Sequence, residues 1–181
     1  MTDAIEYEVI EAGPEWADKY RQFCREAYLT AYVRPDLGIT AEQFSENVFN
    51  SPRVIKYFQD ALNIGDDHKA WLAISDDEVL GGVVGYIYGD YCELQTFYVK
   101  AELRGHGIGH ALYAKILEFA HGLPIQIDVV EYMQDTIDMY RHWGFEIDAS
   151  KGKVIYDWVE WPQQARQAYK GIYMVKPGRK A

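Results

Sequence analysis

The feature that most constrains this chain is the loop at residues 103–109, Leu-Arg-Gly-His-Gly-Ile-Gly, in which three glycines occupy alternate positions. It separates a strand-like segment, residues 93–99, from a segment with helical periodicity, residues 107–120. Glycine allows unusual backbone angles and the close approach of a ligand. The first amides of a helix have no internal partner, and such a helix start binds anions, phosphate above all. With the positive charge of Arg104 beside it, the loop predicts a phosphate-binding site.

Glycine-rich loops are common, and the surroundings of this one exclude two familiar types. No GK[ST] sequence follows, as it does in a Walker A loop. The third glycine comes one residue too early for the dinucleotide-binding GxGxxG pattern, and the preceding strand belongs to a predicted antiparallel meander. A tight turn without a ligand is the alternative that these residues leave open.

Hydrophobic periodicity predicts one α+β domain over residues 1–181, with about seven strands and about four helices in a mixed, mostly antiparallel arrangement. We expect a capping box at Thr40–Gln43 to open the second helix and Ser51-Pro52 to restart it. The strand, helix, strand order over residues 93–130 implies a right-handed crossover and a locally parallel pair of strands. The expected strands are 7–10, 70–74, 79–88, 93–99, 124–130, 154–158 and 171–175, and the expected helices are 16–33, 40–62, 107–120 and 135–143.

Composition and charge narrow the class of protein. The chain has 181 residues, 49% of them apolar and 25% charged, as in ordinary globular domains. Its formal net charge is −10, which disfavours nucleic acid as a partner. Residues 170–181 contain four basic side chains and no acids, so the formal charge of the rest of the chain is −14. Such an acidic surface suits a cationic substrate or simply maintains solubility.

The N-terminal segment and the hydropathy predict a cytoplasmic protein with no membrane partner. Residues 1–16 carry acids where a signal peptide would need a basic segment followed by an apolar run. No apolar stretch approaches the roughly 20 residues that span a bilayer.

Cysteines and histidines predict neither a disulfide framework nor a metal site. Cys24 and Cys92 are far apart in the sequence and form no CxxC motif. His106 and His110 have helical spacing, but they lack the glutamate of HExxH and a third ligand nearby. We therefore expect no metal.

Three segments together carry a family resemblance. Arg104-Gly-His-Gly-Ile-Gly109 resembles the Q/R-x-x-G-x-G/A signature of the Gcn5-related N-acetyltransferases (the GNAT family). Phe97-Tyr-Val99 resembles the apolar strand before that signature, and Tyr140-Arg-His-Trp-Gly-Phe145 resembles the family's Tyr-x-x-x-Gly-Phe segment. The element order is similar across nearly the whole chain. The resemblance implies a GNAT-like fold and an acyltransferase that uses acetyl-CoA as co-substrate.

The resemblance also implies where acetyl-CoA is held. In this family the loop amides bind the pyrophosphate, and the pantetheine arm lies along the preceding strand like an added strand. Many members carry an asparagine seven residues before the tyrosine, whereas this chain has Met133. The side-chain contact that the asparagine makes to the cofactor is therefore expected to differ here. The expected cofactor-binding residues are Phe97, Tyr98, Val99, Arg104, Gly105, His106, Gly107, Ile108, Gly109 and Met133.

Direct transfer requires a base for the amine and an acid for the leaving thiolate. An alkylammonium has a pKa near 10.4 and must lose a proton before it attacks. Glu93 lies eleven residues before Arg104, a spacing that resembles the catalytic glutamate of the histone-acetylating members. Tyr140 stands where the family often places a tyrosine near the cofactor sulfur. A solvated glutamate and a core tyrosine are the alternatives.

The acceptor is expected between the first helices and the last strands. Aromatic faces with carboxylates suit a cationic amine. The candidate substrate-binding residues are Tyr28, Tyr32, Asp157, Trp158 and Glu160, in a region that also contains Tyr156 and Trp161. Core packing of the aromatics and solvation of the acids is the alternative.

The acceptor itself stays open at this stage. A small cationic amine or a polyamine is one class, because the chain broadly resembles bacterial polyamine acetyltransferases. A protein N-terminus, a lysine side chain, an amino acid or an antibiotic is another, and a non-catalytic module that binds acetyl-CoA is a third. A homodimer is compatible with the sequence, which leaves the oligomeric state open.

Overall fold

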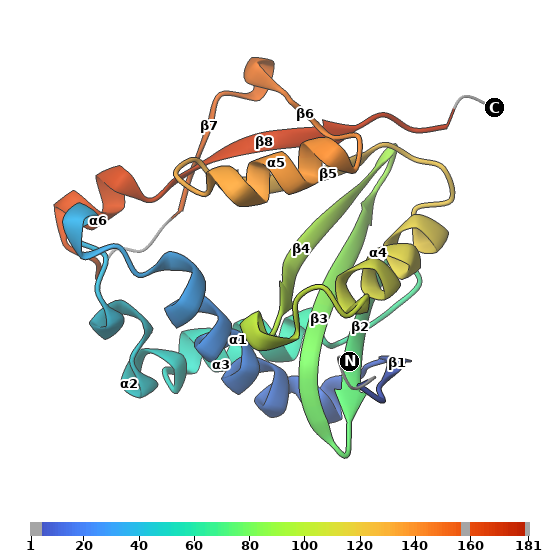
Figure 1. The fold of residues 1–181 in the computed structure, drawn as a ribbon, viewed down its shortest axis with the longest axis horizontal. Coiled ribbons are helices and arrows are strands. Elements are labelled where there is room, and N and C mark those ends of the chain that lie inside the picture. The colour runs from blue at the N-terminus through green and yellow to red at the C-terminus, as the bar shows by residue number, and fades with distance from the viewer. Residues whose placement is uncertain (1–4, 157–159, 180–181) are drawn as a thin grey trace.

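One eight-stranded sheet organises the chain in the computed structural model, which describes residues 5–156 and 160–179 (Figure 1). The strand order is β1-β2-β3-β4-β5-β8-β6, and β7 pairs with β8 as well. Among the strand pairs of the described residues, β4–β5 alone is parallel. The strands are β1 Glu8–Glu11, β2 His68–Ser75, β3 Glu78–Tyr88, β4 Tyr91–Val99, β5 Ile125–Val130, β6 Glu146–Ile147, β7 Lys153–Ile155 and β8 Lys170–Lys176.

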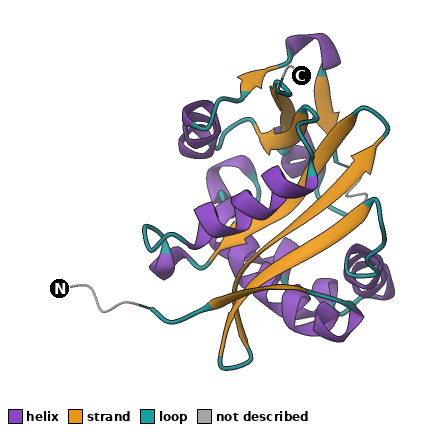
Figure 2. Cartoon of the chain, turned by 90° about the vertical axis from the view of Figure 1, so that its right-hand side faces the viewer, coloured by secondary structure: helices purple, strands orange, loops and turns teal. Residues whose placement is uncertain are grey.

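Helices cover both faces of the sheet (Figure 2). Apolar residues of α1, α2, α3 and α6 form one core cluster with one sheet face, and those of α4 and α5 form a second cluster with the other. Among the described residues, none of the helices combines the length and the apolar character that crossing a membrane requires. The helices are α1 Ala17–Tyr32, α2 Glu46–Phe49, α3 Pro52–Ala61, α4 Ile108–Phe119, α5 Gln134–His142 and α6 Gln163–Ala168.

Glycines on β3 let the helices approach the sheet closely from both sides. A Cβ atom at Gly82 would lie 2.6 Å from Leu72 Cδ2 and 2.9 Å from Tyr20 Cζ of α1. A Cβ atom at Gly85 would lie 2.9 Å from Ile116 Cδ1 of α4, on the opposite face. Because successive strand residues point to opposite faces, these glycines seat α1 and α4 against the centre of the sheet.

The pairing of β4 with β5 is very short. Only Cys92 with Ile125 and Glu93 with Gln126 are in register, so residues 94–99 have an edge that β5 does not cover. A bulge in the β3–β4 ladder follows, and Thr96 has a positive φ of 46°. The Tyr20 hydroxyl of α1 donates to the Thr96 carbonyl oxygen and holds the bulge. The two strands therefore diverge from the end at which they meet (Figure 1).

Most of the expected elements are confirmed, including the parallel β4–β5 pair joined through α4. The expected helix over residues 40–62 is wrong in part: the capping box at Thr40 opens a 3-10 turn, Ala41–Phe44, and two helices, α2 and α3, follow it. The expected restart is confirmed, because Ser51 is the N-cap of α3 and Pro52 is its first residue. Strand β6 and helix α6 were not predicted, because one has two residues and the other is short and polar. Strand β7 ends at Ile155, and residues 157–158 of the expected strand lie outside the described residues.

The close approach at β3 makes a stability prediction. Gly82→Ala is expected to lower the free energy of unfolding by about 1–3 kcal/mol, because the new methyl group overlaps the Tyr20 ring and Leu72. Urea denaturation measures the change. The control is Gly65→Ala, where the nearest atom to a new Cβ is 4.0 Å away, and where we expect a change within about 0.5 kcal/mol. A Gly82→Ala variant as stable as the parent protein would contradict this packing of α1.

Candidate active site

A cleft of about 1580 Å³ opens where β4 and β5 diverge. Its walls come from α1, β4, the glycine loop, β5 and α5, together with part of β8. Nine tyrosines line it, and this aromatic character is a result of the fold, because they come from segments far apart in the sequence. They are Tyr28, Tyr32, Tyr57, Tyr98, Tyr132, Tyr140, Tyr156, Tyr169 and Tyr173.

The glycine loop presents free amides at one end of this cleft. Gly105 and Gly107 have φ values of 83° and 85°, which L-residues rarely adopt. Gly107 is the N-cap of α4 and offers no capping side chain. Within the described chain, the amides of residues 105–110 donate no hydrogen bond, and the first to do so is that of Ala111. These amides and the helix start fit a phosphate group.

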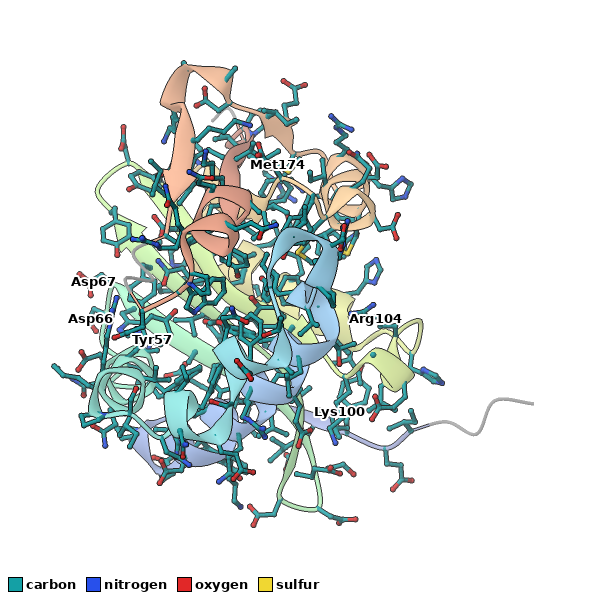
Figure 3. All side chains as sticks on the ribbon, turned by 90° about the vertical axis from the view of Figure 1, so that its left-hand side faces the viewer. Tyr57, Asp66, Asp67, Lys100, Arg104 and Met174 are labelled. Carbon is teal, nitrogen blue, oxygen red and sulfur yellow. The ribbon has the colours of Figure 1, made fainter. Side chains whose placement is uncertain are left out.

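Basic side chains flank the loop. Figure 3 shows Arg104 and Lys100 on the same side of the molecule, around the loop that follows β4. Arg104 is exposed and forms no ion pair with the described residues, whereas Lys100 pairs with Glu78. His106 turns back onto the loop, with its Nδ1 atom 3.2 Å from the Leu103 carbonyl oxygen. Arg104 therefore supplies a positive charge at this end that no acid of the described chain neutralises.

The expected pantetheine strand lies beside the loop. Tyr98 and Val99 pair with β3 on one side, and their other edge is not covered by β5. Phe97 packs against Trp143 with ring centroids 5.9 Å apart. Met133 precedes α5 as its N-cap residue, packs against both core clusters and lines the cleft. The uncovered edge fits an extended ligand that hydrogen-bonds like an additional strand.

Glu93 and Tyr140, the two candidate catalytic residues, both line the cleft. Glu93 lies at the last β4–β5 pair, and its Oε1 accepts a hydrogen bond from Gln95. Tyr140 is only 3% exposed and packs edge-on against Trp143 and Phe145. Burial raises the pKa of Tyr140 well above its usual value, so its hydroxyl keeps its proton at neutral pH. That hydroxyl makes no hydrogen bond to the described residues.

Tyr28 and Tyr32 of α1 line the cleft. Their rings pack at 5.3 Å, and Tyr28 also contacts Tyr98 of β4 with a centroid distance of 5.1 Å. The hydroxyl oxygens of Tyr32 and Tyr98 lie 2.6 Å apart. Burial raises the pKa of Tyr32 to about 12. These neutral tyrosines join α1 to the strand that carries Glu93.

A further acid in the cleft was not among the sequence candidates. Asp128 lies in the middle of β5 and lines the cleft, and its Oδ2 accepts a hydrogen bond from Tyr156. Burial raises the pKa of Asp128, while the bond from Tyr156 partly opposes this shift. The signal was an acid within the apolar run Ile125-Gln-Ile-Asp-Val-Val130, since buried strands rarely carry an unpaired charge.

The remaining candidates are placed as follows. Asp157 and Trp158 lie outside the described residues. Glu160 is exposed and is not among the described residues that line the cleft. The described ranges contain no cluster of three or more histidine, cysteine or acidic side chains suited to a metal, around His106 and His110 or elsewhere. Cys24 and Cys92 are buried free thiols.

Comparisons with known proteins agree with this geometry. The chain matches the model of the acetyltransferase (GNAT) family over residues 19–145. A protein of Escherichia coli (strain K12), the uncharacterized N-acetyltransferase YjgM, is 30% identical over 128 residues, which cover 66% of this chain and 74% of that protein.

Two solved structures share the fold. The PaiA N-acetyltransferase from Thermoplasma acidophilum, in complex with coenzyme A, has a TM-score of 0.63 at 17% identity and covers 96% of this chain and 99% of its own. The ribosomal-protein-S18-alanine N-acetyltransferase from Escherichia coli has a TM-score of 0.68 at 13% identity, with coverage of 97% and 96%. At these identities the likeness concerns the fold alone.

The family match spans well over half of the chain and includes the loop at the start of α4 and the Tyr-x-x-x-Gly-Phe segment. The uncovered edge of β4 and the free loop amides lie along one cleft and within the matched residues. The chain therefore belongs to the acetyltransferase (GNAT) family and is an acetyl-CoA-dependent acyltransferase.

Proposed function

We propose that residues 1–181 act as one N-acetyltransferase domain that moves an acetyl group from acetyl-CoA directly to a small, cationic primary amine. The observation that carries the proposal is one continuous cleft. The free amides of the glycine loop lie at one end, and Glu93, Tyr140 and a tyrosine-rich wall line the rest. The acidic formal charge of −10 favours a cationic acceptor over an anionic one.

The loop and β4 bind the co-substrate in this proposal. Backbone amides from Arg104 to Gly109 donate to the pyrophosphate, and the guanidinium of Arg104 adds charge. The free edge of β4 at Tyr98 and Val99 pairs with the pantetheine arm, while Phe97 and Met133 supply apolar contact. Bound acetyl-CoA supplies a thioester that an amine can cleave.

Glu93 and Tyr140 then act as the proton acceptor and the proton donor of the reaction. The Glu93 carboxylate accepts a proton from the acceptor ammonium, directly or through water, which frees the nitrogen lone pair for attack on the thioester carbon. As the C–N bond forms and the C–S bond breaks, the Tyr140 hydroxyl donates its proton to the departing sulfur. The nitrogen still carries one proton more than the amide product, and it passes that proton to the Tyr140 phenolate, directly or through water. An amide on the open edge of β4 stabilises the developing oxyanion.

The acceptor occupies the tyrosine-lined part of the cleft. Tyr28 and Tyr32 offer ring faces and hydroxyls to an ammonium group. Asp157, Trp158 and Glu160 remain further candidates for acceptor contacts, from the segment that follows Tyr156. The S18-alanine enzyme acts on a protein, so a protein N-terminus is the competing acceptor class.

An amine panel tests the acceptor class. Thiol release from acetyl-CoA is measured with cationic amines, neutral-tailed amines, an anionic amine and a peptide N-terminus, at low and high salt. We expect cationic amines to have the highest kcat/KM at low salt. We expect that preference to shrink at high salt, because screening shortens the reach of the acidic surface. A preference for the anionic amine or the peptide would contradict the proposal.

The loop makes a binding prediction. Gly107→Val is expected to weaken coenzyme A binding at least about tenfold, because a β-branched residue disfavours a φ of 85° and places bulk beside the loop amides. Calorimetry gives the dissociation constant, and circular dichroism checks the fold. The matched control is Gly152→Val, which has a similar φ of 72° outside the cleft and should leave affinity unchanged. Unchanged affinity in a folded Gly107→Val variant would remove the loop from the site.

Tyr140 makes a kinetic prediction. Tyr140→Phe is expected to lower kcat by about 10²- to 10⁴-fold while the coenzyme A dissociation constant changes little, because the hydroxyl acts mainly in the transition state. Single-turnover acetylation together with calorimetry separates the two effects. If acetyl transfer in the variant proceeds at the parental rate, Tyr140 serves only to pack α5.

A further inference from the structure

Glu93 and Asp128 stand on one face of the sheet. Glu93 is in register with Gln126, and Asp128 is two residues farther along β5. Paired residues on adjacent strands point to the same face, as do residues two apart on one strand. Because β5 diverges from β4 beyond this pair, strand geometry places the Cα atoms of the two acids at least about 8 Å apart. Both side chains line the same cleft.

Neither acid has a cationic partner within residues 5–156 and 160–179. Asp128 accepts a hydrogen bond from Tyr156, and Glu93 accepts one from Gln95, but no lysine, arginine or histidine forms an ion pair with either. Arg34, which also lines the cleft, is bound instead by two hydrogen bonds to Asp36. A half-buried carboxylate without a counter-ion is costly, and a ligand cation would relieve that cost.

The groups around Asp128 suit an ammonium in the acetyl-transfer chamber. Burial is the main cause of the raised pKa of Tyr32 and of Tyr140, and the charge of Asp128 adds to both shifts, so the carboxylate lies within electrostatic reach of the proposed acid. Tyr140 is 3% exposed, and its hydroxyl has no hydrogen-bond partner among the described residues, which leaves it available to a bound molecule. Tyrosine rings complete the surroundings and add cation–π attraction.

We propose that Asp128 binds a second ammonium group of the acceptor, so that the acceptor is a short diamine held between Glu93 and Asp128. The inference rests on the proposed function, in which Glu93 takes the proton of the reacting ammonium. Asp128 holds the distal ammonium through its carboxylate, with Tyr156 orienting it. An extended chain of four methylene groups separates two nitrogens by about 6 Å, which fits between the two acids. Diaminoethane is too short to reach both.

The test compares diaminobutane, diaminoethane and butylamine as acceptors, with the kcat and KM of each measured by thiol release. For the parent protein we expect kcat/KM for diaminobutane to exceed that for butylamine at least about tenfold, because a charge-assisted contact is worth 1.5–3 kcal/mol. In Asp128→Asn the ratio should fall close to one, mainly through KM. Asparagine keeps the shape and can still accept from Tyr156, so the variant is expected to fold.

Two controls sharpen the comparison. Glu131→Gln removes an equal charge just beyond β5, from an exposed side chain paired with Lys153 and outside the cleft, and should keep the diamine preference. Asp128→Glu retains the carboxylate and should retain a diamine preference, shifted toward shorter chains.

The outcomes separate the two proposals. If Asp128→Asn lowers kcat for butylamine and diaminobutane by the same factor, Asp128 acts on the reacting nitrogen and the second ammonium site is wrong. Equal use of diaminobutane and butylamine by the parent protein, with both acetylated, would overturn the diamine inference and leave the proposed function intact. Failure of every amine to release thiol would overturn both.

Discussion

The early divergence of β4 from β5 is the constraint on which the rest of this structure depends. Two residue pairs join the strands, and beyond Glu93 the edge of β4 stays uncovered. In an ordinary sheet, a neighbouring strand would form hydrogen bonds with the amides and carbonyls of that edge. Here β5 does not reach them, so they are available to an extended ligand. The bulge at Thr96, held by Tyr20 of α1, couples this divergence to the seating of α1 on β3. Packing far from the loop thereby maintains the cleft.

The same divergence accounts for the electrostatics of the site. It opens a cleft whose walls are mainly aromatic, where tyrosine hydroxyls stay protonated because burial opposes the phenolate. Asp128 is half-buried there, and this burial raises its pKa. No cation of the described chain forms an ion pair with it. Arg104 occupies the other end, beside free amides. In the proposed function, the loop end of this cleft therefore takes the anionic groups and the end with the acids takes the cationic groups.

Local patterns predicted the elements well where a single segment decides its own conformation. The helical period of residues 107–120 and the alternating strands on either side correspond to α4, β4 and β5. The capping box at Thr40 was read correctly as a cap but not as a 3-10 turn, because the length of the turn depends on how Gln43 and Phe44 pack in the core. Strand β6 consists of two residues that pair with β8, and no local period can announce so short an element.

By itself, the sequence determined the glycine loop, its position before a helix and the candidate residues Glu93 and Tyr140, because backbone freedom and helix periodicity are local properties. Only the tertiary structure decided that Asp128 belongs to the same cleft as Glu93. Their proximity depends on the β4–β5 register, a pairing between residues 33 positions apart at Glu93 and Gln126. Burial raises the pKa of an unpaired carboxylate and makes its charged form costly. Burial is likewise a property of the packed fold, and the neighbouring residues in the sequence do not reveal it.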